Sequence, residues 1–129
     1  MTVVSYGVMA PKSLAAAERL AADGIEAEVI DLRTLAPLDL DTVEESVRRT
    51  RTLVVAAEDY RHGGIGAEIA ASMQESLFGE LDAPVLRIGA PFAPVPHSPV
   101  LLEALTPGAD DVERLAREAV KTASGGRQQ

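Results

Sequence analysis

Most of the side chains that could do chemistry in this 129-residue chain lie in or beside one glycine-rich segment. Gly63, Gly64 and Gly66 stand just before a helical pattern, where free backbone N–H groups and the helix dipole favour a bound anion. The spacing fits neither a dinucleotide fingerprint nor a P-loop, because Ile69 replaces the third glycine and no Gly-Lys-Ser/Thr sequence follows. The same glycines also permit positive φ angles and close backbone packing. An anion loop and a tightly packed turn therefore both stay open.

Two carboxylates and one of the two histidines lie beside this loop. Glu58 and Asp59 end an apolar run, and neighbouring carboxylates are able to exchange protons with a substrate. Successive strand residues face opposite ways, so the alternative is that Glu58 holds a local network with Arg61 or nearby N–H groups. His62 and His97 are the only histidines, and without a carboxylate pattern they predict neither zinc nor a catalytic triad. We expect one of them to serve an interface or a gate, or both to be ordinary loop residues.

A stiff proline-rich segment, residues 90–97, follows the last predicted strand. Its prolines exclude a helix and a central strand, and Phe92 is its largest apolar group. A rigid apolar loop of this kind either contacts a partner or packs on its own domain. His97 lies in the same segment, so His62 and His97 are both able to reach one edge of the sheet.

Asp31, Arg33, Pro37 and Asp39 predict structure rather than chemistry. They cover a strand exit, a turn and a helix start. Asp39 or Asp41 is able to cap the following helix, and Arg33 is able to pair with Asp31 or Asp39. These residues need no ligand to explain them.

The elements that must position these residues alternate between strand and helix. Short apolar or β-branched runs predict strands over residues 2–6, 27–32, 52–57 and 84–88, with helical spacing between them. The third run is apolar throughout, which is typical of a parallel strand buried on both faces. We therefore predict an α/β domain of three layers, α/β/α, around a mostly parallel sheet of four or five strands.

The same pattern places the loops, the helix faces and the ends of the domain. Right-handed crossovers bring the loops after Leu32, Ala57 and Ile88 to one edge of the sheet. The first helix has Pro11 in its first turn and Leu14 on its inward face. The folded domain is predicted over residues 1–121, and a disordered polar tail over 122–129.

Composition limits the partners and the compartment. A formal net charge of −8 argues against nucleic acid and anionic membranes, which favour clustered Lys and Arg. No apolar run approaches the ~18 residues of a membrane helix, and no basic and apolar leader is seen. Cysteine is absent, which excludes disulfides and thiolate metal sites. We therefore expect a cytoplasmic protein that binds neither nucleic acid nor membrane.

Taken in order, these motifs resemble the C-terminal domain of the transketolase-like thiamine diphosphate enzymes. They are most similar to the beta subunit of the decarboxylating component of the 2-oxo acid dehydrogenases. The likeness runs nearly to Val120, and its order and spacing are more specific than any one motif. It is carried by residues 3–7, 29–35, Pro37, Asp39, 54–58, Gly63, Gly64, Gly66, Glu68, 86–88, 90–91, 94–96 and 105–107.

The resemblance implies a domain with no catalytic, cofactor-binding or metal-binding residues of its own. In that family, thiamine diphosphate and Mg lie between a pyrimidine-binding domain and a diphosphate-binding domain, the latter on the alpha subunit of two-subunit enzymes. This chain has no Gly-Asp-Gly metal and diphosphate motif, so it is expected to be inactive alone. The resemblance implies homodimer assembly and docking to the acyltransferase core through a small basic subunit-binding domain. The parent oxidoreductase would act on pyruvate or a branched-chain 2-oxo acid.

Two other functions and one structural expectation accompany this interpretation. The parent could instead be a transketolase or a deoxyxylulose-phosphate synthase. The sequence Pro-Val-Pro-His at residues 94–97 disfavours this alternative. The chain could also be a free-standing module that binds a small anion at the glycine loop. Family members usually carry a further antiparallel strand beside the second strand. Without it, strand 27–32 is expected to have an exposed edge.

Overall fold

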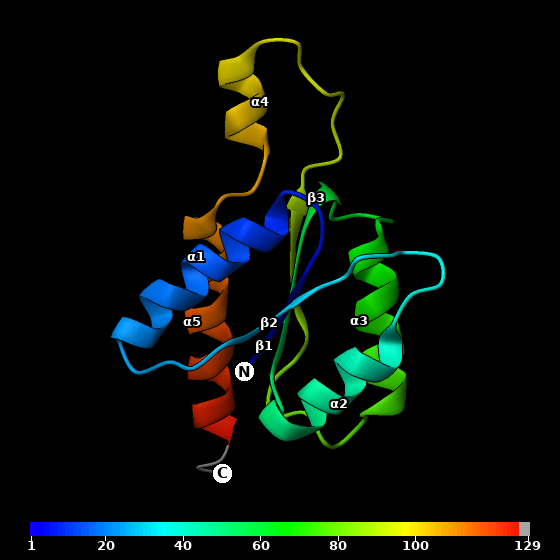
Figure 1. The fold of residues 1–129 in the computed structure, drawn as a ribbon, viewed down its shortest axis with the longest axis vertical. Helices are drawn as coiled ribbons and strands as arrows, with labels where there is room; N and C mark the ends of the chain where they lie inside the picture. Colours follow the sequence, from blue (N-terminus) through cyan, green and yellow to red (C-terminus); the bar gives the residue numbers. More distant parts are fainter. Residues whose placement is uncertain (127–129) are drawn as a thin grey trace.

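The structure, a computed structural model, describes residues 1–126 of the chain. Four parallel strands form one sheet in the order β2-β1-β3-β4. Helices α1 and α5 cover one face of this sheet, and α2 and α3 cover the other (Figure 1), which confirms the predicted α/β/α fold. The strands are β1 (Thr2–Ser5), β2 (Glu28–Asp31), β3 (Leu53–Tyr60) and β4 (Leu86–Ala90). The helices are α1 (Met9–Ala22), α2 (Leu40–Thr50), α3 (Ile65–Ser76), α4 (Pro99–Leu105) and α5 (Ala109–Gly126).

The central strand β3 is buried on both faces over its apolar part. Leu53 and Val55 lie in the apolar cluster with α2 and α3, whereas Val54 and Ala56 lie in the cluster with α1 and α5. Because helices cover both faces, the sequence shows an unbroken apolar run here instead of an alternating one. β3 continues past its predicted end to Tyr60, with a shift of register against β4 along the way.

Helix α1 has Pro11 in its first turn, as predicted, but its predicted inward face is only partly right. It starts at Met9, because Gly7, with φ +56°, turns the chain directly after β1. Leu14, predicted to face inward, is 54% exposed, while Met9 and Ala16 are fully buried. The inward face consists largely of small residues that let the helix lie close to the sheet, so the apolar character of Leu14 was misleading.

The turn between β2 and α2 has the structural role predicted for it. Of the two predicted caps, Asp39 is the N-cap of α2. Its carboxylate accepts the Thr42 hydroxyl at 2.7 Å and the Thr42 N–H at 3.1 Å, and these two bonds, in that order, hold the pKa of Asp39 below its usual value. Arg33 pairs with Asp31 at 3.0 Å. Pro37 lies in the turn, where its carbonyl oxygen accepts a threonine hydroxyl.

The C-terminal part of the chain differs from prediction in two places. A short helix, α4, with Pro99 in its first turn, follows the proline-rich segment where only loop is predicted. It has no buried residue, and Figure 1 shows it projecting beyond the end of the sheet. Helix α5 continues to Gly126 and buries Ala123, so residues 122–126 are helical and are not the predicted disordered tail. The remainder of that predicted tail, residues 127–129, lies outside the described residues.

Strand β2 forms one edge of the sheet, as the sequence predicts. It pairs with β1 along its whole length, and among residues 1–126 no strand pairs with its other side. Its two central residues, Val29 and Ile30, are only half-buried. The unpaired N–H and C=O groups of such an edge are able to accept a further strand from another segment or chain.

Candidate functional site

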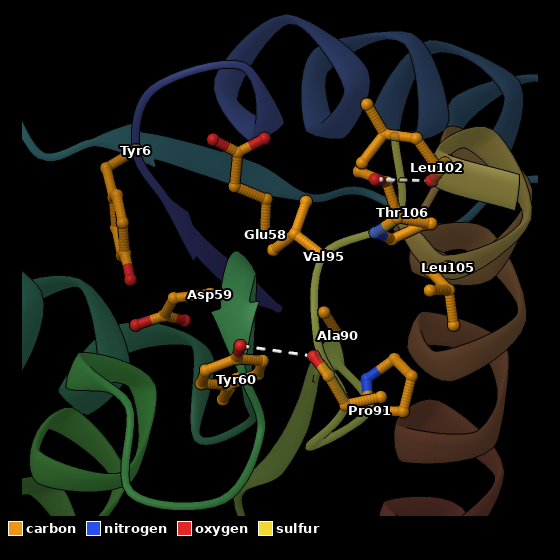
Figure 2. A pocket seen from close by; sticks show the side chains of 12 residues that line it. Tyr6, Glu58, Asp59, Tyr60, Ala90, Pro91, Val95, Leu102, Leu105 and Thr106 are labelled. Atoms are coloured by element: carbon orange, nitrogen blue, oxygen red, sulfur yellow. Dashed lines mark hydrogen bonds between the residues drawn. The ribbon is translucent and has the colours of Figure 1, made fainter. Parts of the chain in front are cut away.

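The carboxyl ends of β3 and β4 border a cavity of about 480 Å³ (Figure 2). One wall carries polar groups, namely Glu58 and Asp59 from β3 and Tyr6 from the turn after β1. The opposite wall is apolar and comes from the segment between β4 and α5, including Leu102. The loop after Leu32, predicted to join this edge, contributes no lining residue, because β2 lies at the edge of the sheet and β1 separates it from β3.

Tyr60 fastens the proline-rich segment to the end of β3. Its hydroxyl donates a hydrogen bond to the Ala93 carbonyl oxygen at 3.1 Å (Figure 2), and its ring packs edge-on against Phe92 with centroids 5.0 Å apart. The His62 ring also contacts Phe92, at a centroid distance of 5.9 Å. The structure thus brings together His62 and Phe92 from the predicted set. His97 is exposed, lies farther along the segment and does not line this cavity.

Asp59, and not Glu58, organises the glycine loop. Its Oδ2 atom accepts the Ile65 N–H at 3.0 Å, in the first turn of α3, where the helix dipole stabilises a carboxylate. Glu58 is exposed, points away from Asp59 (Figure 2) and forms no hydrogen bond or ion pair with any described residue. The local network predicted for Glu58 is therefore formed by its neighbour. Glu68, also in the first turn of α3, is exposed.

The fold explains two of the three glycines in this loop, Gly63 by its backbone angle and Gly64 by close packing, whereas a Cβ atom on Gly66 would make only a close van der Waals contact. Gly63 has φ +75°, which side chains disfavour. A Cβ atom on Gly64 would lie 2.6 Å from the Asp59 Oδ2 atom, and one on Gly66 would lie 3.4 Å from Val55 Cγ1. Because a carboxylate of the chain itself already accepts the first amide of α3, the structure favours the tightly packed turn over the anion loop.

The Tyr6 hydroxyl is buried beside these carboxylates. It points toward Asp59 (Figure 2) and makes no hydrogen bond of ordinary geometry with the described residues. Burial raises the pKa of Tyr6 well above its ordinary value. The close approach of its hydroxyl to the Asp59 carboxylate, then the negative charge of Asp59 and last that of Glu58, raise it further. No sequence motif indicates Tyr6. Its position directly after strand β1 is the available signal, because parallel sheets bind ligands at the carboxyl ends of their strands.

Replacing Asp59 by asparagine is expected to lower the pKa of Tyr6 toward that of a free tyrosine. The change removes a negative charge that faces the hydroxyl, while the amide oxygen still accepts the Ile65 N–H. An ultraviolet absorbance titration of the wild type and the variant measures the shift, because Tyr6 and Tyr60 are the only tyrosines.

The matched control is Glu58→Gln, which should lower the pKa of Tyr6 less, because Glu58 contributes least to raising it. Equal shifts in the two variants would contradict the role of Asp59.

The raised pKa of Tyr6 also makes the stability of the protein depend on pH. Above about pH 10 the unfolded chain loses a tyrosine proton that the native state retains, so the free energy of unfolding falls as pH rises. Asp59→Asn should reduce this loss.

Part of the apolar wall comes from helix α4, where the sequence predicts only a loop. Leu102 and Leu105 of α4 line it, and so does Thr106, whose hydroxyl donates to the Leu102 carbonyl oxygen at 2.8 Å (Figure 2). The pattern that predicts them is a proline at a helix start, Pro99, followed by leucines at helical spacing. The surrounding prolines obscure this pattern.

Two further features are absent from the part of the chain that the structure describes. Its His, Asp and Glu side chains form no group of three or more that could hold a metal ion. None of its helices is both long enough and apolar enough to cross a bilayer. The cavity itself presents the carboxylates of Glu58 and Asp59, the hydroxyls of Tyr6, Tyr60 and Thr106, and an apolar wall.

Residues 1–112 match the family model described as transketolase, C-terminal domain. The chain is 43% identical over 121 residues to the beta subunit of acetoin:2,6-dichlorophenolindophenol oxidoreductase from Cupriavidus necator, a match that covers 94% of this chain and 36% of that protein. It is also 43% identical over 98 residues to the pyruvate dehydrogenase E1 component subunit beta from Bacillus subtilis, covering 76% of this chain and 30% of that subunit.

A solved structure extends the comparison to the fold. The chain superposes on a split-gene transketolase, described as an inactive beta4 tetramer, with a TM-score of 0.80 and 32% identity, covering 95% of this chain and 39% of that one. The chain spans about a third of the length of these curated relatives. The family model and the three-layer fold agree over most of its length, and the chain therefore belongs to the family of transketolase C-terminal domains.

Proposed function

We propose that this chain acts as an assembly domain of a 2-oxo acid dehydrogenase beta subunit and is inactive by itself. The observation that carries the proposal is the arm, defined as residues 91–105, which projects from the domain (Figure 1). Five of its large apolar side chains are between 43% and 75% exposed. They are Phe92, Val95, Val100, Leu101 and Leu102. Single exposed apolar residues are ordinary, but several on one projecting segment are typical of a protein contact.

The parent reaction that we propose is the oxidative decarboxylation of pyruvate or a branched-chain 2-oxo acid. Its support is the similarity to a pyruvate dehydrogenase E1 beta subunit. Residues 1–126 do not fit thiamine diphosphate and Mg. Their His, Asp and Glu side chains form no cluster of three or more that could hold a metal ion, and the Gly-Asp-Gly motif is missing. We place both in the rest of the parent enzyme, the alpha subunit and the pyrimidine-binding domain. The cytoplasm is the compartment we propose, because the chain has no cysteine.

Two kinds of contact follow from this proposal. The arm would bury its apolar side chains against a second copy of the chain, forming a homodimer, and the beta4 tetramer of the split-gene transketolase supports such self-association. The net charge of −8 would suit the small basic subunit-binding domain of an acyltransferase, and opposite charges speed such an encounter. Exposed carboxylates such as Glu58 lie beside the arm.

Sedimentation velocity of the chain, alone and mixed with a subunit-binding domain at low and high salt, tests both contacts. We expect a dimer of the chain alone that dissociates on dilution, and a complex with the small domain that weakens as salt rises. The variant Val100→Asp/Leu101→Asp should be monomeric, because it places two charges on the apolar surface of the arm. Its far-ultraviolet circular dichroism should match the wild type, since both side chains are exposed.

A wild-type chain that stays monomeric up to about 100 μM would contradict the assembly role, because obligate dimers associate far more tightly than this. The matched control is Phe78→Asp, which adds a charge at an exposed apolar residue outside the arm and should leave the dimer intact.

The structural similarity to the split-gene transketolase favours a transketolase as the second candidate parent. That parent predicts self-association without any complex with the subunit-binding domain.

A further inference from the structure

Arg61 and Arg87 differ from the other arginines that the structure describes. Neither has a carboxylate partner within 4.0 Å among residues 1–126, although the chain carries an excess of Asp and Glu. Every other described arginine forms at least one ion pair. These paired residues are Arg19, Arg33, Arg48, Arg49, Arg51, Arg114 and Arg117. Two unpaired guanidinium groups side by side in an acidic protein leave a local positive charge that the fold itself does not neutralise.

Each of the two side chains donates a hydrogen bond to the backbone carbonyl oxygen of the other residue. Arg61 Nε donates to the Arg87 carbonyl oxygen at 3.2 Å, and Arg87 Nη1 donates to the Arg61 carbonyl oxygen at 2.7 Å. The remaining guanidinium N–H groups make no hydrogen bond with the described residues. Two arginine forks are therefore positioned before any ligand arrives, which lowers the entropy cost of binding.

The sheet explains why these residues meet although they lie far apart in the sequence. Leu86 and Ile88 of β4 pack into the cluster with α1 and α5, so the intervening Arg87 faces the side of α3. Gly89 allows the close approach of the two strands, because a Cβ atom there would lie 2.7 Å from the Arg61 backbone nitrogen. Pairing of β3 with β4 thus places Arg61 and Arg87 together.

A second cavity, of about 450 Å³, lies against this pair and is separate from the one with the acidic wall. Arg61, Arg87 and His62 form its polar part, and Pro91 and Phe92 form an apolar wall. Its size is that of a small-molecule site. Two guanidinium forks match the three terminal oxygens and double charge of a phosphate monoester better than they match one carboxylate.

We propose that this second cavity is a binding site for a small organic phosphate. The phosphate lies on the guanidinium groups of Arg61 and Arg87, with His62 beside it, and the organic part lies against Phe92 and Pro91. This site is distinct from the helix N-terminus at the glycine loop, where Asp59 already accepts the first amide. It shares Pro91 and Phe92 with the arm, but its charged groups, Arg61 and Arg87, lie outside the arm. Ligand titration therefore tests this site separately from the sedimentation test of assembly.

Calorimetric titration of the full chain with phenyl phosphate, in a buffer free of phosphate, tests the site. We expect saturable binding with one site, and weaker binding of inorganic phosphate, which lacks a ring to contact Phe92. Arg87→Gln should weaken the binding of phenyl phosphate by about tenfold or more, because it removes one charged fork. Arg33→Gln is the matched control, since Arg33 is an exposed arginine away from this cavity, and it should bind as the wild type does.

Nuclear magnetic resonance of the backbone amides locates the bound ligand and shows whether each variant is folded. Phenyl phosphate should shift the Gly63 and Ala67 resonances, which border the cavity. If Arg87→Gln does not fold, Arg61→Gln replaces it, because Arg61 is exposed. The proposal is overturned if the wild type does not approach saturation by about 10 mM ligand, or if the arginine variant binds as tightly as the control. Equal binding of succinate would overturn it too, in favour of a carboxylate site.

Discussion

Replacing Gly64 by alanine is expected to destabilise this protein by on the order of 3 kcal/mol. The added Cβ atom would collide with the Tyr60 carbonyl oxygen and would lie 2.6 Å from Asp59 Oδ2 and 2.8 Å from Asp59 Cγ. Tyr60 is held by its hydrogen bond to Ala93, and Asp59 by its bond to the Ile65 amide, so neither contact relaxes cheaply. The cost is due to crowding rather than to an unusual backbone angle, because φ at Gly64 is −78°. Thermal unfolding should show a melting temperature lower by roughly 10–15 °C.

Gly125→Ala is the matched control for this substitution. Gly125 lies near the end of α5, and no heavy atom lies within 4 Å of the position that its Cβ would take. Alanine is the better helix former, so this variant should be as stable as the wild type or slightly more stable. A wild-type melting temperature for Gly64→Ala would show that the chain between β3 and α3 shifts freely, contrary to the packing described.

Leu77→Ala is expected to cost about 3 kcal/mol of unfolding free energy, through loss of apolar contact and an unfilled cavity. Leu77 is 0% exposed and packs in the cluster with α2 and α3, among Val43, Val47 and Met73. The cluster has few large side chains with which to refill the space, since aromatic residues make up only 3% of the chain. Urea unfolding should show a lower midpoint with an unchanged slope.

The adjacent residue provides the control for this prediction. Phe78 has the larger side chain and is 84% exposed, so Phe78→Ala should change the unfolding free energy by less than about 0.5 kcal/mol. Equal costs at Leu77 and Phe78 would contradict the burial described for α3 and the turn after it. The two residues are both apolar and adjacent, so hydrophobicity alone does not distinguish them.

Much of the fold could be predicted because its patterns are local. The unbroken apolar run that begins at Leu53 indicates a strand covered on both faces, and alternation of strands with helices indicates a parallel sheet. Leu14 shows that such local patterns do not predict which face of a helix is buried. Periodicity identifies a helix, but small residues such as Ala16 can face the sheet while a leucine faces solvent. Helix α4 was not predicted because the prolines around it are typical of a loop and obscure the helical spacing of its leucines.

The candidate sites could be predicted only in part. The sequence indicated His62, Phe92 and the glycine loop, and the fold brings His62 and Phe92 into contact. It assigned the local network to Glu58, while the neighbouring Asp59 forms it, because the orientation of two adjacent carboxylates depends on how the end of β3 is shaped. The Tyr6 hydroxyl and the Arg61–Arg87 pair carry no local motif that would have revealed them.

By itself, the sequence determined the alternation of strands and helices, the parallel sheet and the family. These depend on turn residues, apolar periodicity and motif order, which are properties of neighbours along the chain. Only the tertiary structure decided which side chains share a site. Tyr6 meets Asp59, and Arg61 meets Arg87, because sheet pairing brings distant segments to one place. Such contacts depend on register, twist and local shifts in pairing, and no short stretch of sequence encodes these.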